Sequence, residues 1–149
     1  MQPCKFPERL LGPLLGHCAH LARERMDARL TEYDVTPVQV HVLHYLYHHA
    51  NQTTQRDLGA YLKVKPSTVN GILDRMEEKG LVSRCVSGSD ARHRIIALTE
   101  EGLARQERCR QAFFEAETLL AAGFSEAERE QLFGLLRRIL TNLEEDRNL

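Results

Sequence analysis

The chain has 149 residues, 28% of them charged and 42% hydrophobic, and a formal net charge of −1. This length and composition fit a single globular domain and exclude a disordered chain. No run approaches the roughly 18 consecutive apolar residues of a membrane span, and the N-terminus lacks the charged-then-apolar pattern of a signal peptide. The four cysteines are widely spaced without a C-x-x-C pair, which favours reduced thiols. We therefore expect a cytoplasmic protein that does not bind membranes.

Charge is unevenly distributed along the chain. Residues 54–94 contain eight Lys or Arg and five Asp or Glu, a balance of +3, so the remainder carries −4. A basic middle segment between acidic flanks indicates that only the middle approaches nucleic-acid phosphates.

The N-terminal part predicts two helices. Apolar residues spaced by three and four predict a helix over about residues 7–30, and Gly12-Pro13 either starts this helix or kinks it. A second helix is predicted from Thr36, because Thr36 suits the N-cap, Pro37 the first turn and Gln39 the return bond of a capping box. Its expected apolar face is Val38, Val42, Leu43 and Leu46.

The middle segment predicts two further helices and a hairpin. Thr54 and Asp57 also fit a capping box, which begins a short helix that is expected to bury Leu58 and Leu62. Pro66 begins a fourth helix and Gly80 ends it; its apolar positions are Val69, Ile72, Leu73 and Met76. Residues 81–86 and 94–98 have strand character and flank a polar turn at 87–90, the pattern of a β-hairpin.

The C-terminal part predicts two more helices. Thr99 and two glutamates begin a long helix, whose almost wholly polar stretch 105–111 is typical of a segment that bridges packed regions. Ser125 and Glu128 form a further capping box. The helix that follows is apolar on two sides, which is more surface than one small domain covers, so we expect a second chain to cover it. The expected dimerisation residues are Leu132, Leu136, Ile139 and Leu143.

Helix, helix and hairpin over residues 54–98 follow the order of a winged helix-turn-helix, whose second helix enters the major groove. The expected fold class is mainly α with a small β-hairpin wing, plus N- and C-terminal dimerisation helices. On the fourth helix, Ser67, Gly71 and Asp74 point away from the apolar stripe. A mid-helix glycine costs about 1 kcal/mol relative to alanine, and a groove-facing position that needs no side chain would justify this cost.

The chain resembles the MarR family of bacterial transcription regulators over essentially its whole length. The matching segments are residues 35–39 with 42–43, 54–55 with 57–58, 67–69 with 73–84, 90–94 and 98–102. The resemblance implies one domain over residues 1–149, with dimerisation helices in 1–34 and 100–149 and a DNA-binding lobe over 36–99. It also implies a homodimer that binds a pseudo-palindromic operator in double-stranded DNA, usually as a repressor released by a small molecule.

The resemblance also assigns roles to single residues. The wing-tip arginine, here Arg92, enters the minor groove, and Asp90 braces the wing by pairing with an arginine such as Arg94. Lys65 departs from the family, where Ser or Asp often precedes the proline; a cation cannot accept helix N–H bonds, so we expect Lys65 to contact a phosphate. The predicted DNA contacts are Thr54, Gln55, Lys65, Ser67, Thr68, Asn70, Gly71, Arg75, Arg92 and Arg94.

Six of the seven histidines lie on the first two predicted helices. Zinc-sensing relatives take further ligands from histidines on the long fifth helix, which has none here, and peroxide-sensing relatives carry their cysteine in an aromatic-rich stretch. We expect no required cofactor or metal, and a small organic effector; a zinc- or redox-responsive regulator of the same fold is one alternative. The possible effector or metal ligands are His17, Cys18, His20, His41 and His44.

An enzyme is not expected, because the sequence has no Gly-rich phosphate loop, nucleophile elbow or recognisable carboxylate pair. A second alternative is a winged-helix protein-interaction module without DNA binding. Steep salt dependence of binding to duplex DNA would distinguish a DNA-binding protein from such a module.

Overall fold

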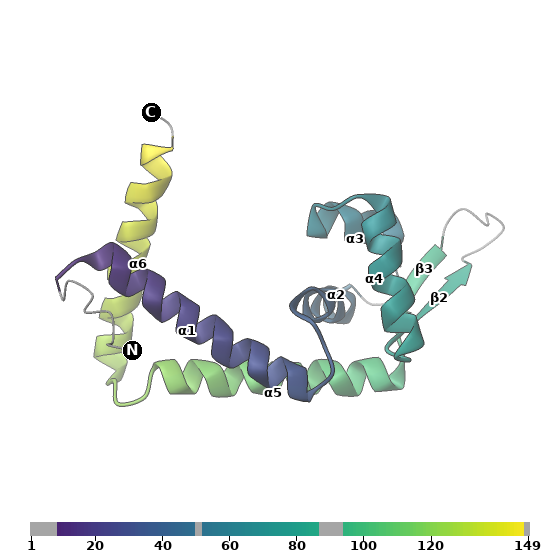
Figure 1. The fold of residues 1–149 in the computed structure, drawn as a ribbon, viewed down its shortest axis with the longest axis horizontal. Coiled ribbons are helices and arrows are strands. Elements are labelled where there is room, and N and C mark those ends of the chain that lie inside the picture. The colour runs from purple at the N-terminus through teal and green to yellow at the C-terminus, as the bar shows by residue number, and fades with distance from the viewer. Residues whose placement is uncertain (1–8, 50–51, 87–93, 148–149) are drawn as a thin grey trace, which may run out of the picture. The chain divides into compact units, whose positions relative to one another are not determined.

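The computed structural model describes residues 9–49, 52–86 and 94–147, and within these residues the chain forms six helices and three strands. This confirms the expected mainly α fold with a small β wing. Figure 1 labels the helices and the strands β2 and β3. The described chain divides into two units, one ending at Ala116 and the other beginning at Glu117, and helix α5 runs through both. The elements are α1 (Leu11–Glu32), α2 (Pro37–His48), β1 (Thr53–Thr54), α3 (Gln55–Leu62), α4 (Pro66–Glu78), β2 (Val82–Val86), β3 (Arg94–Leu98), α5 (Glu100–Leu120) and α6 (Glu126–Asp146).

The helices begin at the residues that their capping patterns predict. Thr36, Thr54 and Ser125 are the N-caps of α2, α3 and α6, and each forms a complete capping box with the residue three positions later. Helix α1 begins at Leu11, so Gly12-Pro13 occupy its first turn, where a proline removes no intrahelical hydrogen bond. The alternative of a kink at Pro13 is therefore wrong.

The core of the first unit joins α2, α3, α4 and the sheet. Its fully buried side chains include Leu43, Leu58, Leu73, Met76 and Ile96. Three expected core positions, Val38, Leu62 and Ile72, are only half-buried, whereas Val40, which was not expected in the core, is buried.

The sheet has three antiparallel strands in the order β1-β3-β2. The pair β2–β3 is the predicted hairpin, with Val82 opposite Leu98 and Val86 opposite Arg94. Strand β1 was not predicted, because two threonines are too short a run to give a strand pattern. Thr53 nevertheless pairs with Ile96 and is only 2% exposed.

Two glycines shape the junction between α4, β2 and α5. Gly80 has a φ of 71°, the left-handed conformation that ends a helix at little cost only for glycine. At Gly102, an added Cβ would overlap the carbonyl oxygen of Leu81. The first turn of α5 therefore packs directly on the backbone that leaves α4. Thr99 caps this turn, because its Oγ1 accepts from the Gly102 N–H at 3.0 Å.

Helix α5 has a buried face that passes through its polar stretch 105–111, and the expectation that this stretch bridges packed regions stays a prediction. Gly102, Gln106, Cys109 and Ala112 are all buried and follow each other at spacings of three and four, which defines one helical face. Small and polar residues make up this face, so hydropathy alone did not mark it. Of the helices within the described residues, none is long and apolar enough to cross a membrane.

Candidate nucleic-acid interface

Helix α4 presents a polar face opposite its core face. Val69, Leu73 and Met76 are buried, and the expected polar face is exposed. Its exposed residues are Ser67, Thr68, Asn70, Gly71 and Arg75. An added Cβ at Gly71 would have no atom within 4 Å, so packing within the chain does not require a glycine there.

Lys65 is the N-cap residue of α4 and makes no side-chain hydrogen bond to the helix. This agrees with the chemical argument that an ammonium cannot accept the N–H bonds of a helix start. The side chain is exposed, and a phosphate contact for it stays a prediction.

Helix α3 begins beside α4, and its cap uses the Thr54 side chain. Thr54 Oγ1 accepts from the Asp57 N–H at 3.2 Å and donates to Asp57 Oδ2 at 2.8 Å. Hydrogen bonds from the backbone and side chain of Thr54 lower the pKa of Asp57. Gln55 Nε2 donates to Asn70 Oδ1 at 3.3 Å, which links α3 to the polar face of α4.

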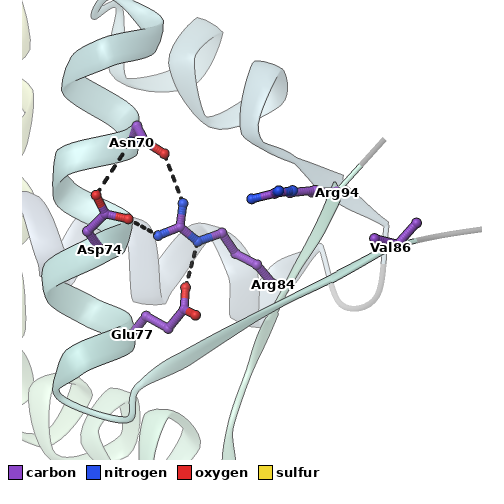
Figure 2. A pocket seen from close by; sticks show the side chains of 6 residues that line it. All are labelled: Asn70, Asp74, Glu77, Arg84, Val86 and Arg94. Atoms are coloured by element: carbon purple, nitrogen blue, oxygen red, sulfur yellow. Dashed lines mark hydrogen bonds and ion pairs between the residues drawn. The ribbon is translucent and has the colours of Figure 1, made fainter. Parts of the chain in front are cut away.

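Arg84 on β2 reaches across to three side chains of α4 (Figure 2). Its Nε donates to Glu77 Oε2 at 2.6 Å, its Nη1 to Asn70 Oδ1 at 2.9 Å, and its Nη2 to Asp74 Oδ1. The Arg84 side chain is 10% exposed, and those of Asp74 and Glu77 are about half exposed. Desolvation lowers the pKa of Arg84, but the hydrogen bonds from Glu77 and Asp74 outweigh it and raise the pKa.

Sequence reasoning missed this network. Arg84 and Asn70 are 14 residues apart and lie on elements of different type, so no helical or strand periodicity relates them. The sequence feature that could have indicated the network is an arginine, Arg84, in a predicted strand that directly follows a helix containing several acidic residues.

The wing is described only in part. Arg94 begins β3 and is exposed, and it lines the same open pocket as Asn70 and Arg84. Asp90 and Arg92 lie outside the described residues, so the predicted minor-groove contact and the brace between Asp90 and Arg94 stay predictions.

Two of the cations in the basic middle segment serve the fold. Lys79 Nζ donates to the Asp34 carbonyl at 2.8 Å and to Gln39 Oε1 at 3.1 Å, and Arg84 is occupied by carboxylates of α4. Neither of these two cations is therefore available to contact a phosphate in this arrangement.

The predicted dimerisation residues lie along α6, which has no buried residue in the single chain. Leu132, Leu136 and Leu143 are 41%, 38% and 61% exposed, and Ile139 is half-buried.

The candidate sensing residues fall into two groups. His17, Cys18 and His20 are exposed on α1, whereas His41 and His44 line a pocket of about 390 Å³ between α2 and α5. Among the described residues, no three His, Cys, Asp or Glu side chains are placed to hold a metal ion.

The pocket between α2 and α5 is mostly aromatic and apolar. Burial, followed by the neighbouring His48 and His41, lowers the pKa of His44, and burial raises the pKa of the Cys109 thiol. Gln106 Oε1 is buried and accepts no hydrogen bond within the described chain. The lining residues are Val40, His41, His44, Tyr47, His48, Gln106, Cys109, Arg110 and Phe113.

Comparisons with known proteins identify the family. The sequence model of the MarR family matches residues 33–93. MepR, a transcription regulator of the Staphylococcus aureus multidrug efflux pump MepA, is 32% identical, with 90% of this chain and 98% of that chain covered and a TM-score of 0.78. The chain belongs to the MarR family. The S. aureus MepR–DNA complex (32% identity, 93% and 99% coverage, TM-score 0.67) and S. aureus MepR bound to ethidium bromide (32%, 93% and 99%, 0.71) are also similar.

Membership of the MarR family confirms the resemblance and the winged helix fold. This MarR-family chain is a DNA-binding transcription regulator, and the family is one of non-enzymatic transcription factors. The individual DNA contacts, including Ser67, Thr68 and Arg75, stay predictions.

Proposed function

We propose that the chain acts as a homodimeric repressor, which binds a pseudo-palindromic operator through α4 and the wing and leaves it when a small organic molecule binds. The observation that carries this proposal is a pair of surfaces of contrasting chemistry: a polar, exposed face on α4 and an uncovered apolar surface on α6.

The apolar surface of α6 supports the dimer. Leu135, Leu136, Leu140 and Leu143 are between 38% and 61% exposed in the single chain, and contiguous exposed apolar surface marks protein–protein contacts. A two-fold dimer presents α4 twice. Two recognition helices fit half-sites about one DNA turn apart, which is why we expect a pseudo-palindromic operator.

The pocket between α2 and α5 supports a small organic effector. Tyr47 and Phe113 supply aromatic surface, and Gln106 Oε1 is an acceptor without a hydrogen-bond partner among the described residues. Arg110 is neutralised by Glu107, with Nη2 to Oε1 at 2.5 Å. These features fit an aromatic molecule that carries an N–H or O–H donor. Ethidium bromide, which MepR binds, is one probe of this class.

Helix α5 offers a way for a ligand in the pocket to affect the dimer, and through the dimer the binding of DNA. The same helix lines the pocket and continues into the unit that carries α6. A ligand releases DNA only if it prefers one arrangement of the dimer over another, because equal affinity for both shifts nothing.

The test combines a mass measurement with a DNA selection. Sedimentation of the purified protein should give a dimer, and selection from genomic fragments should recover a two-fold symmetric motif. Added aromatic compounds, ethidium bromide among them, should lower the affinity for this motif. A folded monomer that selects an asymmetric single site would contradict the proposed dimer, whereas a dimer indifferent to the whole panel would contradict the proposed effector class.

A further inference from the structure

The Arg84 network fixes the orientation of the Asn70 side chain on the DNA-facing side of α4. A guanidinium only donates hydrogen bonds, and an ionised carboxylate only accepts them. Arg84 Nη1 lies 2.9 Å from Asn70 Oδ1, and Asn70 Nδ2 lies 3.4 Å from Asp74 Oδ2. The partners therefore dictate that the carbonyl of Asn70 faces Arg84 and that its amide group faces Asp74.

Both acceptor sites of the Asn70 carbonyl are occupied. An amide oxygen has two lone pairs, and Oδ1 accepts from Arg84 Nη1 at 2.9 Å and from Gln55 Nε2 at 3.3 Å. The amide nitrogen carries two hydrogens, of which Asp74 Oδ2 accepts one. Asn70 is exposed, and what it offers to a ligand in this arrangement is a single N–H donor.

This arrangement changes how Asn70 can read a base. Asparagine usually recognises adenine with two bonds, its carbonyl accepting from N6–H and its amide donating to N7. With the carbonyl occupied, the first of these bonds is lost. A single donor can still bond N7 of adenine, O6 or N7 of guanine, or O4 of thymine in the major groove, whereas cytosine presents only a donor.

We infer that Arg84 is a positioning residue for DNA recognition, which holds Asn70 as a donor, so that α4 rejects cytosine and does not favour adenine over guanine or thymine at one base pair of each half-site. This inference rests on the proposed role of α4 in the major groove. Arg84 also places one positive charge between the two carboxylates of Asp74 and Glu77, which reduces their repulsion of DNA phosphates.

Lysine cannot replace arginine in this role. A lysine at position 84 keeps the charge, but its single ammonium lacks the planar fork that bonds Glu77, Asp74 and Asn70 at once. Arg84→Lys should therefore retain non-specific DNA affinity and its salt dependence, while Asn70 loses its fixed orientation. Arg56→Lys is the matched control, because it makes the same chemical change at an exposed position of α3 outside the network.

The experiment is a selection of bound sequences from randomised duplex DNA with the unmodified protein, Asn70→Ala, Arg84→Lys, the double variant and Arg56→Lys. We expect the unmodified protein to prefer the other three bases over cytosine at the pair that depends on Asn70, on the order of tenfold, without favouring adenine over guanine or thymine. Asn70→Ala and Arg84→Lys should lose the preference at this same pair, the double variant should lose no more, and Arg56→Lys should keep it.

Three results would overturn the inference. The first is an adenine preference at the Asn70-dependent pair of the unmodified protein, a readout that needs no Arg84 variant to fold. The second is that Arg84→Lys keeps the base preference of the unmodified protein. The third is that Arg84→Lys loses the preference at a different base pair from the one that Asn70→Ala affects. If the unmodified protein selects a clear motif and any of these three results is found, the inference is wrong but the proposed function is not affected. If the unmodified protein shows no sequence preference at all, both the inference and the proposed function are contradicted.

Discussion

Gly71 lies in the interior of α4, and a Cβ added there meets no atom within 4 Å. Replacing an exposed mid-helix glycine by alanine stabilises a helix by up to about 1 kcal/mol. If α4 approaches the floor of the major groove at this position, the added methyl group instead disturbs DNA binding. We therefore expect Gly71→Ala to raise the free energy of unfolding and to lower operator affinity.

Chemical denaturation and a fluorescence titration with operator DNA measure these two opposite effects. Gly134→Ala is the control, because Gly134 lies within α6 and its added Cβ would also meet nothing; it should stabilise the chain without loss of affinity. Unchanged operator affinity of Gly71→Ala would show that position 71 does not face the groove.

At the scale of single residues, the sequence predicted the interactions between residues that are close together in the chain. The caps at Thr36, Thr54 and Ser125 each require only a partner three positions later, and all three form. The partners of Arg84 and the burial of Cys109 could not be predicted in this way, because they arise when distant elements pack.

The N-terminus of α3 is an element whose stability should depend on pH. Hydrogen bonds from the Thr54 backbone and side chain lower the pKa of Asp57 below its ordinary value. A carboxyl with a lowered pKa in the folded state contributes stability that is present above its unfolded pKa of about 4 and is lost as the pH falls through the folded pKa.

We therefore expect the free energy of unfolding to decrease as the pH is lowered through this acidic range. Asp57→Asn should make this decrease shallower. Urea denaturation of both proteins between about pH 5 and pH 2.5 compares the slopes. Equal slopes for the two proteins would mean that the Asp57 cap does not contribute.

The pocket between α2 and α5 gives a second prediction at the scale of elements. Phe113 lines this pocket and is 44% exposed, whereas Phe114 is not among its lining residues. Phe113→Ala should weaken binding of an aromatic ligand on the order of tenfold, because it removes aromatic contact surface.

A fluorescence titration with ethidium bromide checks this, with Phe114→Ala as the control and sedimentation of each variant to confirm an unchanged mass. Equal loss in both variants would place the ligand outside this pocket.

At the scale of elements, apolar periodicity predicts some helices and strands but not others. Strong apolar periodicity predicted α4 and its buried Val69, Leu73 and Met76. The buried face of α5 contains glycine, glutamine, cysteine and alanine instead, so only the packed structure reveals it. Strand β1 exists because β3 offers a free edge next to Thr53, which no local pattern encodes.

At the scale of the whole molecule, the exposed leucines of α6 predict dimerisation. Leu136→Glu should give a monomer, since a buried unpaired charge costs several kcal/mol at an interface. Sedimentation measures the mass, and circular dichroism checks that the helices remain. Arg138→Glu, a charge reversal at an exposed polar position of the same helix, should leave the dimer intact. A folded dimer in Leu136→Glu would show that the partner does not cover this face.

The central claim is that the dimer reads DNA through the polar face of α4, and a comparison of two duplexes tests it most directly. Operator affinity should be measured for the selected motif and for a scrambled duplex of equal length, with the unmodified protein and with Ser67→Ala at several salt concentrations. We predict that one dimer binds the motif about a thousandfold or more tightly than the scrambled duplex, and that Ser67→Ala reduces this ratio without changing the salt slope. Equal affinity of the unmodified protein for both duplexes, or a ratio that Ser67→Ala leaves intact while only the salt slope changes, would contradict the claim.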